Sequence, residues 1–392
     1  MLDWKRMLSL LLALCLLIPC ALAEEDGDTD WDFFADGIPM EEVLLDEEND
    51  FASDLVISDE IYEELSEWDA EIDDTVDHGV LEVNENLPGH IINILLVGVD
   101  TRDTDVAGQR DGNQHGDVQI ILSINTETGS VKLTSLQRDL YVTLPGYKSK
   151  NRINVAYAWG QSNPKLNGSG GQFAMRVINH SFQMNIEYYA TINFYGLASI
   201  VDELGGIDME LTSAEAGHIN SYLRQHPPAY DNHKGDGYVR QELERRDGMQ
   251  HLDGVQAVMY ARTREIDNDF NRTERQRRLL EILLQKIMTE GMSVPRLMSL
   301  MDTVVPYVET NMSMTDMFNL AIGLLQSGII ERAQNGETLM EQFRIPMDDT
   351  WYYASVERGG GRMSVVDFKS GGLQKNVEAL HEFIYGEYIP AK

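Results

Sequence analysis

The clearest hydrophobic pattern in the chain is a set of short apolar runs between residues 91 and 136. An apolar, β-branched run at Ile91–Val97, with Asn93 as its one polar residue, ends at a glycine and is typical of a central strand buried on both faces. Val118–Ile124 and Val131–Leu136 predict two further strands, and Asn125–Gly129 predicts the turn that joins them into a hairpin. We therefore expect organised structure to begin at residue 91.

Helical and strand patterns alternate through the rest of the chain. We expect helices at Gln172–Gln183, Tyr195–Leu204, Leu252–Tyr260 and over Met292–Ser327, strands at Tyr188–Asn193 and Ile207–Leu211, and a closing strand pair at Trp351–Phe368. The polar stretch Thr212–Gly248 contains glycines and two prolines and predicts a surface insertion or lid. Strands alternating with helices indicate an α/β fold, a layered α-β-α domain with a mixed, largely antiparallel central sheet.

Three side chains stand at the ends of the first three strands. Asp100 follows the first strand, Asp117 precedes the second, and Arg138 follows the third. An antiparallel arrangement brings all three to the same end of the sheet. Two carboxylates with several waters are typical of a Mg²⁺ site that also takes phosphate oxygens. Asp is equally a common turn residue, so the strand ends alone leave both interpretations open.

The polar pattern before residue 88 differs from the rest. Residues 1–23 carry Lys5 and Arg6, an apolar run and a small-x-small ending, which predicts a signal peptide that is either cleaved or retained as a membrane anchor. Residues 24–87 hold 26 Asp or Glu and no Lys or Arg, which accounts for most of the net charge of −34. Such a segment repels itself, so we expect a disordered acidic linker. Its few aromatic residues are either docking motifs or ordinary solvated positions.

This division predicts an exported protein with one folded domain at residues 88–392, including a C-terminal extension from about residue 291. Cys15 and Cys20 both lie in the export segment, which excludes a cysteine nucleophile or a cysteine-ligated zinc in the mature chain. The acidic linker also argues against nucleic acid as a partner, because affinity for nucleic acid comes mainly from basic residues.

The most distinctive charged pattern is a run of six arginines within 17 positions, without a lysine. These are Arg262, Arg264, Arg272, Arg275, Arg277 and Arg278, with Asp267 and Asp269 between them. Guanidinium groups bind phosphate or carboxylate oxygens two at a time, which suits an anion held in a defined geometry. A salt-bridged, exposed helix is the structural alternative.

The residues after Asn271 favour the anion site. Asn271 can cap a helix, and Leu279 and Leu283 follow at helical spacing. Arg275 shares a face with these leucines, so it should point inward near a helix N-terminus. Such an end is favourable for phosphate, and a buried arginine needs an anionic partner.

Six ordered motifs together resemble the LytR–CpsA–Psr family of cell-wall glycopolymer ligases. They are Asn93–Arg102, Leu136–Asp139, Arg152–Tyr157, Val201–Ile207, His251–Ala257 and Ala261–Gln276. The resemblance covers residues 91 to 287 and implies an α/β domain that binds a polyprenyl-pyrophosphate-linked glycan at the membrane surface. Family members transfer the glycan phosphate to a peptidoglycan hydroxyl and release polyprenyl phosphate, outside the cytoplasmic membrane.

The resemblance also implies roles for individual residues. Asp100 and Asp117 would coordinate Mg²⁺. The pyrophosphate would be bound by Arg138, Arg262, Arg264, Arg272 and Arg275, with Arg102 and Gln276 assisting. Asp267 or Asp269 would orient the arginines or act as the base for the incoming hydroxyl. Phosphoryl transfer depends mostly on positioning and charge neutralisation, which this set would supply.

One motif departs from the family pattern. The family usually has an arginine and a small residue before the metal-binding aspartate, where this chain has His115-Gly116-Asp117. This departure keeps a non-catalytic wall- or lipid-binding module as an alternative to the transferase. A polyprenyl-pyrophosphate hydrolase, in which the same site passes the phosphate to water, is a second alternative. A DNA-binding regulator is opposed by the export segment and the net negative charge.

Overall fold

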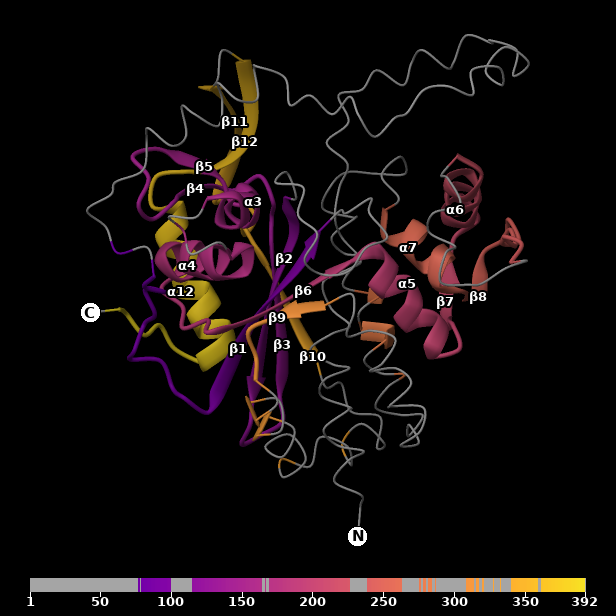
Figure 1. Ribbon diagram of the computed structural model, residues 1–392, viewed down its shortest axis with the longest axis horizontal. Helices are drawn as coiled ribbons and strands as arrows, with labels where there is room; N and C mark the ends of the chain where they lie inside the picture. Colours follow the sequence, from indigo (N-terminus) through magenta and orange to yellow (C-terminus); the bar gives the residue numbers. More distant parts are fainter. Residues whose placement is uncertain are drawn as a thin grey trace.

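The computed structural model describes residues 77, 79–99, 115–163, 166, 169–225, 238–262, 308–313, 340–358 and 361–391, with separate positions between 275 and 332. Its centre is a six-stranded mixed sheet (Figure 1). The strand order is β10 (Met340–Ile345), β3 (Val131–Leu136), β2 (Gly116–Asn125), β1 (Ile91–Val99), β6 (Tyr188–Asn193) and β9 (Val308–Thr310). β1–β2, β2–β3 and β6–β9 are antiparallel, and β1–β6 and β10–β3 are parallel, so the predicted mixed sheet is confirmed.

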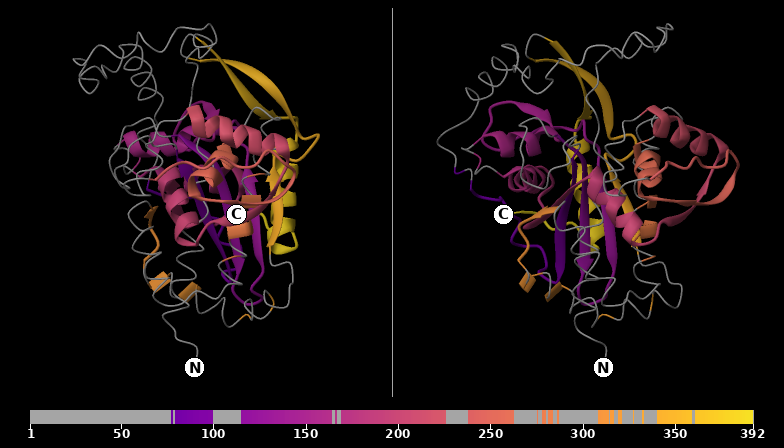
Figure 2. Two further views of the ribbon diagram at one scale, coloured as in Figure 1. Left: turned by 90° about the vertical axis from the view of Figure 1, so that its right-hand side faces the viewer. Right: turned by 45° about the vertical axis from the view of Figure 1, so that its right-hand side comes forward.

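Helices cover both faces of this sheet (Figures 1 and 2). One face carries α3 (Val155–Ser162), α4 (Gly170–Phe182) and α12 (Gly372–Tyr385), and the other carries α5 (Phe194–Glu203), α6 (Ser213–Gln225) and α7 (Gly254–Arg262). Three two-stranded sheets lie outside the central one: β4 (Tyr141–Thr143) with β5 (Lys150–Arg152), β7 (Ile207–Leu211) with β8 (Gly248–Leu252), and β11 (Trp351–Arg358) with β12 (Gly361–Phe368).

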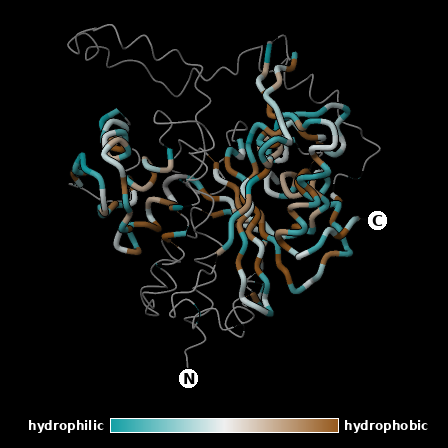
Figure 3. Tube along the Cα trace, turned by 180° about the vertical axis from the view of Figure 1, so that it is seen from behind, coloured by the Kyte–Doolittle hydropathy of each residue, from teal (hydrophilic) through white to brown (hydrophobic). Residues whose placement is uncertain are grey.

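Strand β1 shows why the sheet lies between two helical layers. Ile94 and Leu96 pack into the core beneath α5–α7, whereas Leu95 and Val97 pack into the core beneath α3, α4 and α12. All four side chains are 0% exposed. Figure 3 shows the same concentration of hydrophobic positions along the central strands. A strand buried on both faces needs a nearly continuous apolar run, and β1 has one in which Asn93 is the one polar residue.

Helices α3 and α4 pack closely because small residues lie between them. A Cβ on Gly160 would lie 2.5 Å from the Ser169 carbonyl oxygen. A Cβ on Gly171 would lie 2.2 Å from the ring of Tyr189 on β6. Both positions therefore require glycine, since real Cβ atoms essentially never show such distances.

Several segments differ from the sequence expectations. The first part of the expected surface insertion is the amphipathic helix α6, whose Ile219 is 0% exposed. Val308–Thr310, expected to be helical, forms the edge strand β9 instead. Strand β10 and helix α12 were not predicted, and they complete one edge and one face of the domain.

Residues at the end of the acidic segment belong to the folded body. Asn84 is 2% exposed, and its amide donates to the carbonyls of Gln183 and Ile389. The Glu82 carboxylate accepts hydrogen bonds from Nε and Nη2 of Arg176, at 2.9 and 2.7 Å, and lies 2.7 Å from Nδ1 of His180. The segment that we divided off at residue 87 therefore reaches helix α4 several residues earlier.

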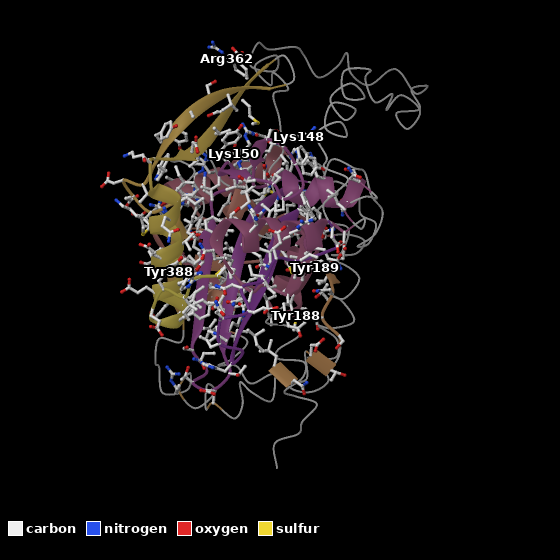
Figure 4. All side chains as sticks on the ribbon, turned by 90° about the vertical axis from the view of Figure 1, so that its left-hand side faces the viewer. Lys148, Lys150, Tyr188, Tyr189, Arg362 and Tyr388 are labelled. Carbon is white, nitrogen blue, oxygen red and sulfur yellow. The ribbon has the colours of Figure 1, made fainter. Side chains whose placement is uncertain are left out.

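The β11–β12 pair forms a ribbon that extends from the body of the domain (Figures 1 and 2). Figure 4 shows Lys148 and Lys150 near its base and Arg362 towards its far end. Nζ of Lys150 lies 3.8 Å from Oδ1 of Asp367, which fixes the β4–β5 hairpin against the ribbon. Within the described part of the chain, none of the helices has the length and apolar character needed to cross a bilayer.

Candidate functional site

The first part of the candidate site lies at the end of β1, where β2 begins. Val99 pairs with Gly116 after an irregularity in the register, and Asp117 is the next residue on β2. Nη1 of Arg138, two residues past β3, lies 3.6 Å from Oδ1 of Asp117. The side chains of Asp117 and Arg138 are 4% and 18% exposed. The predicted convergence at one sheet end is confirmed for these two residues.

Asn154, between β5 and α3, connects the same residues. Its Nδ2 donates to Oδ1 of Asp117 at 3.0 Å. Its backbone N–H donates to the Arg138 carbonyl at 3.2 Å, and its own carbonyl accepts from the Gly116 N–H at 3.0 Å. Gly116 is itself in close contact: a Cβ there would lie 3.1 Å from Cβ of Tyr157. The small residue before Asp117 therefore sits where little space is left, and His115 is the position that departs from the family motif.

A second acidic and basic pair continues the site outward. Oδ1 of Asp139 lies 3.2 Å from Nε of Arg152, and Oδ2 lies 3.7 Å from Nε of Arg138. Arg152 also donates from Nε and Nη2 to the Ser364 carbonyl of the ribbon, at 2.9 and 2.7 Å. Neither Asp139 nor Arg152 was selected from the sequence. Both lie within the family motifs, so an ion-pair search across those motifs could have found them.

The arginine-rich segment is described in part. Arg262 ends α7, and residues 275, 278, 279, 281–283 and 286 are helical. Leu279 and Leu283 are 0% and 1% exposed, and Arg275 is 5% exposed, which confirms the predicted inward face. Burial raises the pKa of Tyr260 to about 12, together with the charge of Glu215, while Arg278 and Arg275 act in the opposite direction. The Arg275 guanidinium therefore lies close enough to Tyr260 to influence its ionisation.

The remaining predicted site residues lie outside the described residues. They are Asp100, Arg102, Arg264, Asp267, Asp269, Arg272 and Gln276. The structure thus brings together Asp117 and Arg138, and it buries Arg275 in the layer formed with α7. The assignments for the other residues stay predictions.

A polar cluster missed by the sequence lies under α3. Oε2 of Glu309 accepts from the hydroxyl of Tyr157 at 3.4 Å, and Oε1 accepts from Tyr189 at 3.0 Å. Nε2 of Gln161 donates to the Tyr157 hydroxyl at 3.2 Å. Burial and the charge of Glu309 raise the pKa of Tyr157, so this phenol stays neutral. The cluster joins strand β9 to helix α3 and supports the helix that follows Asn154.

The described residues fit a divalent cation in part. Asp117 supplies a buried carboxylate, and Oδ1 of the 3%-exposed Asn154 is buried without a hydrogen-bond partner. Carboxylate oxygens bind Mg²⁺ directly, and amide oxygens either bind it or accept hydrogen bonds from its bound waters. Among the described positions, no group of three or more His, Cys, Asp or Glu side chains is placed to bind a metal. Asp100, the second predicted ligand, lies outside them.

Fold and site together define an α/β protein that presents guanidinium groups and a buried carboxylate at one end of its sheet, an arrangement suited to binding a phosphorylated ligand. The model of the LytR-CpsA-Psr family matches residues 58–359. The chain therefore belongs to this family, and the resemblance identified from the six motifs is confirmed.

The chain is similar to several characterised relatives. It is 30% identical over 231 residues to the polyisoprenyl-teichoic acid–peptidoglycan teichoic acid transferase TagU of Enterococcus faecalis, covering 58% of this chain and 64% of that protein. It is 27% identical over 243 residues to TagV of Bacillus subtilis, a transferase of the same name, covering 61% and 54%. The matched region thus spans less than two thirds of the length of these relatives.

Solved structures share the fold. Protein gbs0355 of Streptococcus agalactiae superposes with a TM-score of 0.54 at 20% identity, covering 77% of this chain and 90% of that one. TagV of B. subtilis superposes with a TM-score of 0.52 at 21% identity, covering 78% and 100%. The α/β architecture is therefore that of the family.

Proposed function

We propose that this protein transfers a glycopolymer phosphate from a polyprenyl-pyrophosphate carrier to a hydroxyl of peptidoglycan and releases polyprenyl phosphate. The proposal is supported by family membership and by the names of its relatives, which are teichoic acid transferases acting on peptidoglycan. The observation that carries it in this chain is the contact of Arg138 with the buried Asp117 at the sheet end.

In the proposed reaction, the acceptor hydroxyl oxygen attacks the phosphorus bonded to the glycan. The new P–O bond forms as the bond to the bridging oxygen breaks. That oxygen leaves with the electron pair as part of polyprenyl phosphate, and the hydroxyl proton passes to a base. Asp267 or Asp269 would either act as this base or orient the arginines. The site lies, in this proposal, on the outer face of the cytoplasmic membrane, where the predicted export segment would deliver the domain.

Arg138 has a defined part in this reaction. Its guanidinium is positioned from two sides, by Asp117 at 3.6 Å and by Asp139 at 3.7 Å, and it is mostly withdrawn from water. A guanidinium that is already oriented can neutralise charge on phosphate oxygens without reorganising during the reaction. Arg152 extends the positive charge toward the ribbon.

Mg²⁺ would be bound by Asp117 and, by prediction, Asp100, and it would neutralise charge on the non-bridging oxygens of the pyrophosphate. Asn154 and Arg138 both contact the Asp117 carboxylate, which would help to orient it toward such an ion. Asp117→Asn would remove the ligand charge while keeping the size of the side chain, so we expect transfer to require much more Mg²⁺.

The test uses labelled lipid-linked glycan with and without peptidoglycan. We expect label to enter peptidoglycan and Arg138→Ala to reduce this transfer by at least a hundredfold, a loss consistent with one charged phosphate contact of about 3 kcal/mol. Arg224→Ala is the matched control, because Arg224 pairs with Glu242 on the surface at α6. Release of polyprenyl phosphate at the same rate without acceptor would identify a hydrolase. Tight lipid binding without turnover at any Mg²⁺ concentration would identify a binding module.

A further inference from the structure

Asn154 contacts three residues at the candidate site through its side chain and its backbone. Its side-chain N–H₂ bonds the Asp117 carboxylate, its backbone N–H bonds the Arg138 carbonyl, and its carbonyl bonds the Gly116 N–H. It lies immediately before α3, which Tyr157 fixes to Glu309 on β9. The side chain of Asn154 therefore has little freedom to turn away from Asp117.

The direction of the Asn154 amide is dictated by charge. An ionised Asp117 carboxylate only accepts hydrogen bonds, so the N–H₂ end must face it. The amide oxygen consequently points elsewhere, and there Oδ1 is buried without a hydrogen-bond partner. Leaving a buried polar atom unpaired costs free energy. A partner that arrives with the ligand would recover this free energy.

A second amide on the same face of β2 has the same feature. Gln119 lies two residues after Asp117, so both side chains leave the strand on one side. Its Nε2 donates to the carbonyls of Gly116 and Ile153, and its Oε1 is buried without a partner at a residue that is 1% exposed. Buried amide oxygens without a hydrogen-bond partner therefore occur both on Asn154, which contacts Asp117, and on Gln119, two residues further along β2.

A hydrated divalent cation is the partner whose chemistry fits. Mg²⁺ retains several of its waters when a protein binds it through one or two carboxylates. Those waters are ligands of the cation and strong hydrogen-bond donors, and a group that accepts from one of them, as Asn154 Oδ1 would, belongs to a layer outside the ligands. Groups in this outer layer orient the ligands and raise metal affinity by about 10- to 100-fold.

We propose that Asn154 is a positioning residue for the metal site: its Nδ2 orients Asp117, and its Oδ1 accepts a hydrogen bond from a water bound to the cation. The inference rests on the proposed function only in taking Asp117 as a metal ligand. If Asn154 had a purely structural role, replacing it would leave the metal affinity of the folded protein unchanged.

Asn220 provides a matched comparison within the same chain. It is also a buried asparagine, 1% exposed, but both ends of its amide are paired inside the protein. Nδ2 donates to the Leu243 carbonyl, and Oδ1 accepts from the Leu243 N–H, both at 2.8 Å. Asn220→Ala should therefore lower stability without affecting the metal site.

The experiment measures Mn²⁺ binding to the full chain by the loss of the free Mn²⁺ signal in electron paramagnetic resonance. We expect Asn154→Ala to weaken Mn²⁺ binding by at least tenfold and Asn220→Ala to change it by less than twofold. Asn154→Ser has a shorter side chain that cannot reach Asp117 in the same way, so it should weaken Mn²⁺ binding similarly. This variant replaces Asn154→Ala in the experiment if the alanine variant does not fold. Unchanged affinity in a folded Asn154 variant would overturn the proposal, as would the absence of Mn²⁺ binding by the parent protein.

A second measurement separates this inference from the proposed function. If the parent binds Mn²⁺ and Asn154→Ala weakens it, the positioning role stands even when no glycan transfer is observed. Where transfer is observed, raising the Mn²⁺ concentration should restore the rate of Asn154→Ala but not that of Asp117→Ala. Failure of excess Mn²⁺ to restore Asn154→Ala would count against a role exerted through the metal.

Discussion

Glu82→Gln should destabilise the domain, although Glu82 lies in the acidic segment. The carboxylate is the partner of Arg176, whose side chain is 3% exposed, and both Nε and Nη2 donate to its Oε1. Removing one partner of a buried ion pair costs about 3–5 kcal/mol. Glu82 itself is 30% exposed, so water can reach part of the pair, and we expect a loss of about 2–3 kcal/mol.

The same contact predicts a pH dependence. Partial burial by itself would raise the pKa of the Glu82 carboxyl, but the hydrogen bonds and charges of Arg176 and His180 outweigh it and hold the pKa below its ordinary value. A carboxyl with a lowered folded-state pKa contributes stability above its unfolded pKa, and this stability is lost as the pH falls through the folded value. The difference between parent and variant should therefore shrink below about pH 4.5.

Urea unfolding at pH 7 and again near pH 3.5 measures both the loss of unfolding free energy and its dependence on pH. In a separate thermal measurement at neutral pH, the unfolding midpoint of Glu82→Gln should fall by about 4–10 °C. Glu85→Gln, three residues away and exposed, is the control and should change stability by less than about 0.5 kcal/mol. Equal stability of parent and Glu82→Gln at pH 7 would refute the view that residues 81–87 are part of the folded body.

Three further predictions concern packing, acid stability and the ribbon. Gly171→Ala should cost more than about 3 kcal/mol in unfolding free energy, because its methyl group would lie 2.2 Å from the ring of Tyr189; denaturation showing a smaller cost would mean that β6 can move. Burial lowers the pKa of His381, so the stability that neutral His381 contributes is present above pH 6.5 and is lost as the pH falls through its lower folded-state pKa. The melting temperature of His381→Gln should therefore depend less on pH across that interval than that of the parent. An unchanged slope of melting temperature against pH would exclude His381 as the source of the acid sensitivity. Arg152→Ala should speed amide hydrogen exchange at residues 361–368, because Arg152 donates two bonds to the Ser364 carbonyl; unaltered exchange would show that the ribbon is held by other contacts.

The sequence predicted those elements whose hydrophobic pattern is set locally. Val131–Leu136, Tyr188–Asn193 and Ile207–Leu211 form strands with the expected bounds. The three residues of β9 form a strand because β6 offers an edge, which a local pattern does not reveal. α6 was missed because its short apolar stripe lies within a polar stretch.

The candidate site divides in the same way. Asp117 and Arg138 could be predicted to meet, because antiparallel strands fix which ends coincide. Asp139 and Arg152 could be noticed as charged residues within the family motifs. Their pairing with each other, like the contacts of Asn154, depends on how the β4–β5 hairpin folds back over the sheet end. Registers follow from pairing rules, whereas side-chain contacts between loops depend on the finished tertiary structure.

The two ends of strand β1 have different neighbours. Glu82 and Asn84 bind helix α4 and the chain terminus near the Ile91 end, while Asp117 adjoins Val99 at the other. Nine residues of strand separate these ends by about 26 Å. The chain that joins the folded body at Glu82 therefore does so about one strand length away from the contact of Asp117 with Arg138.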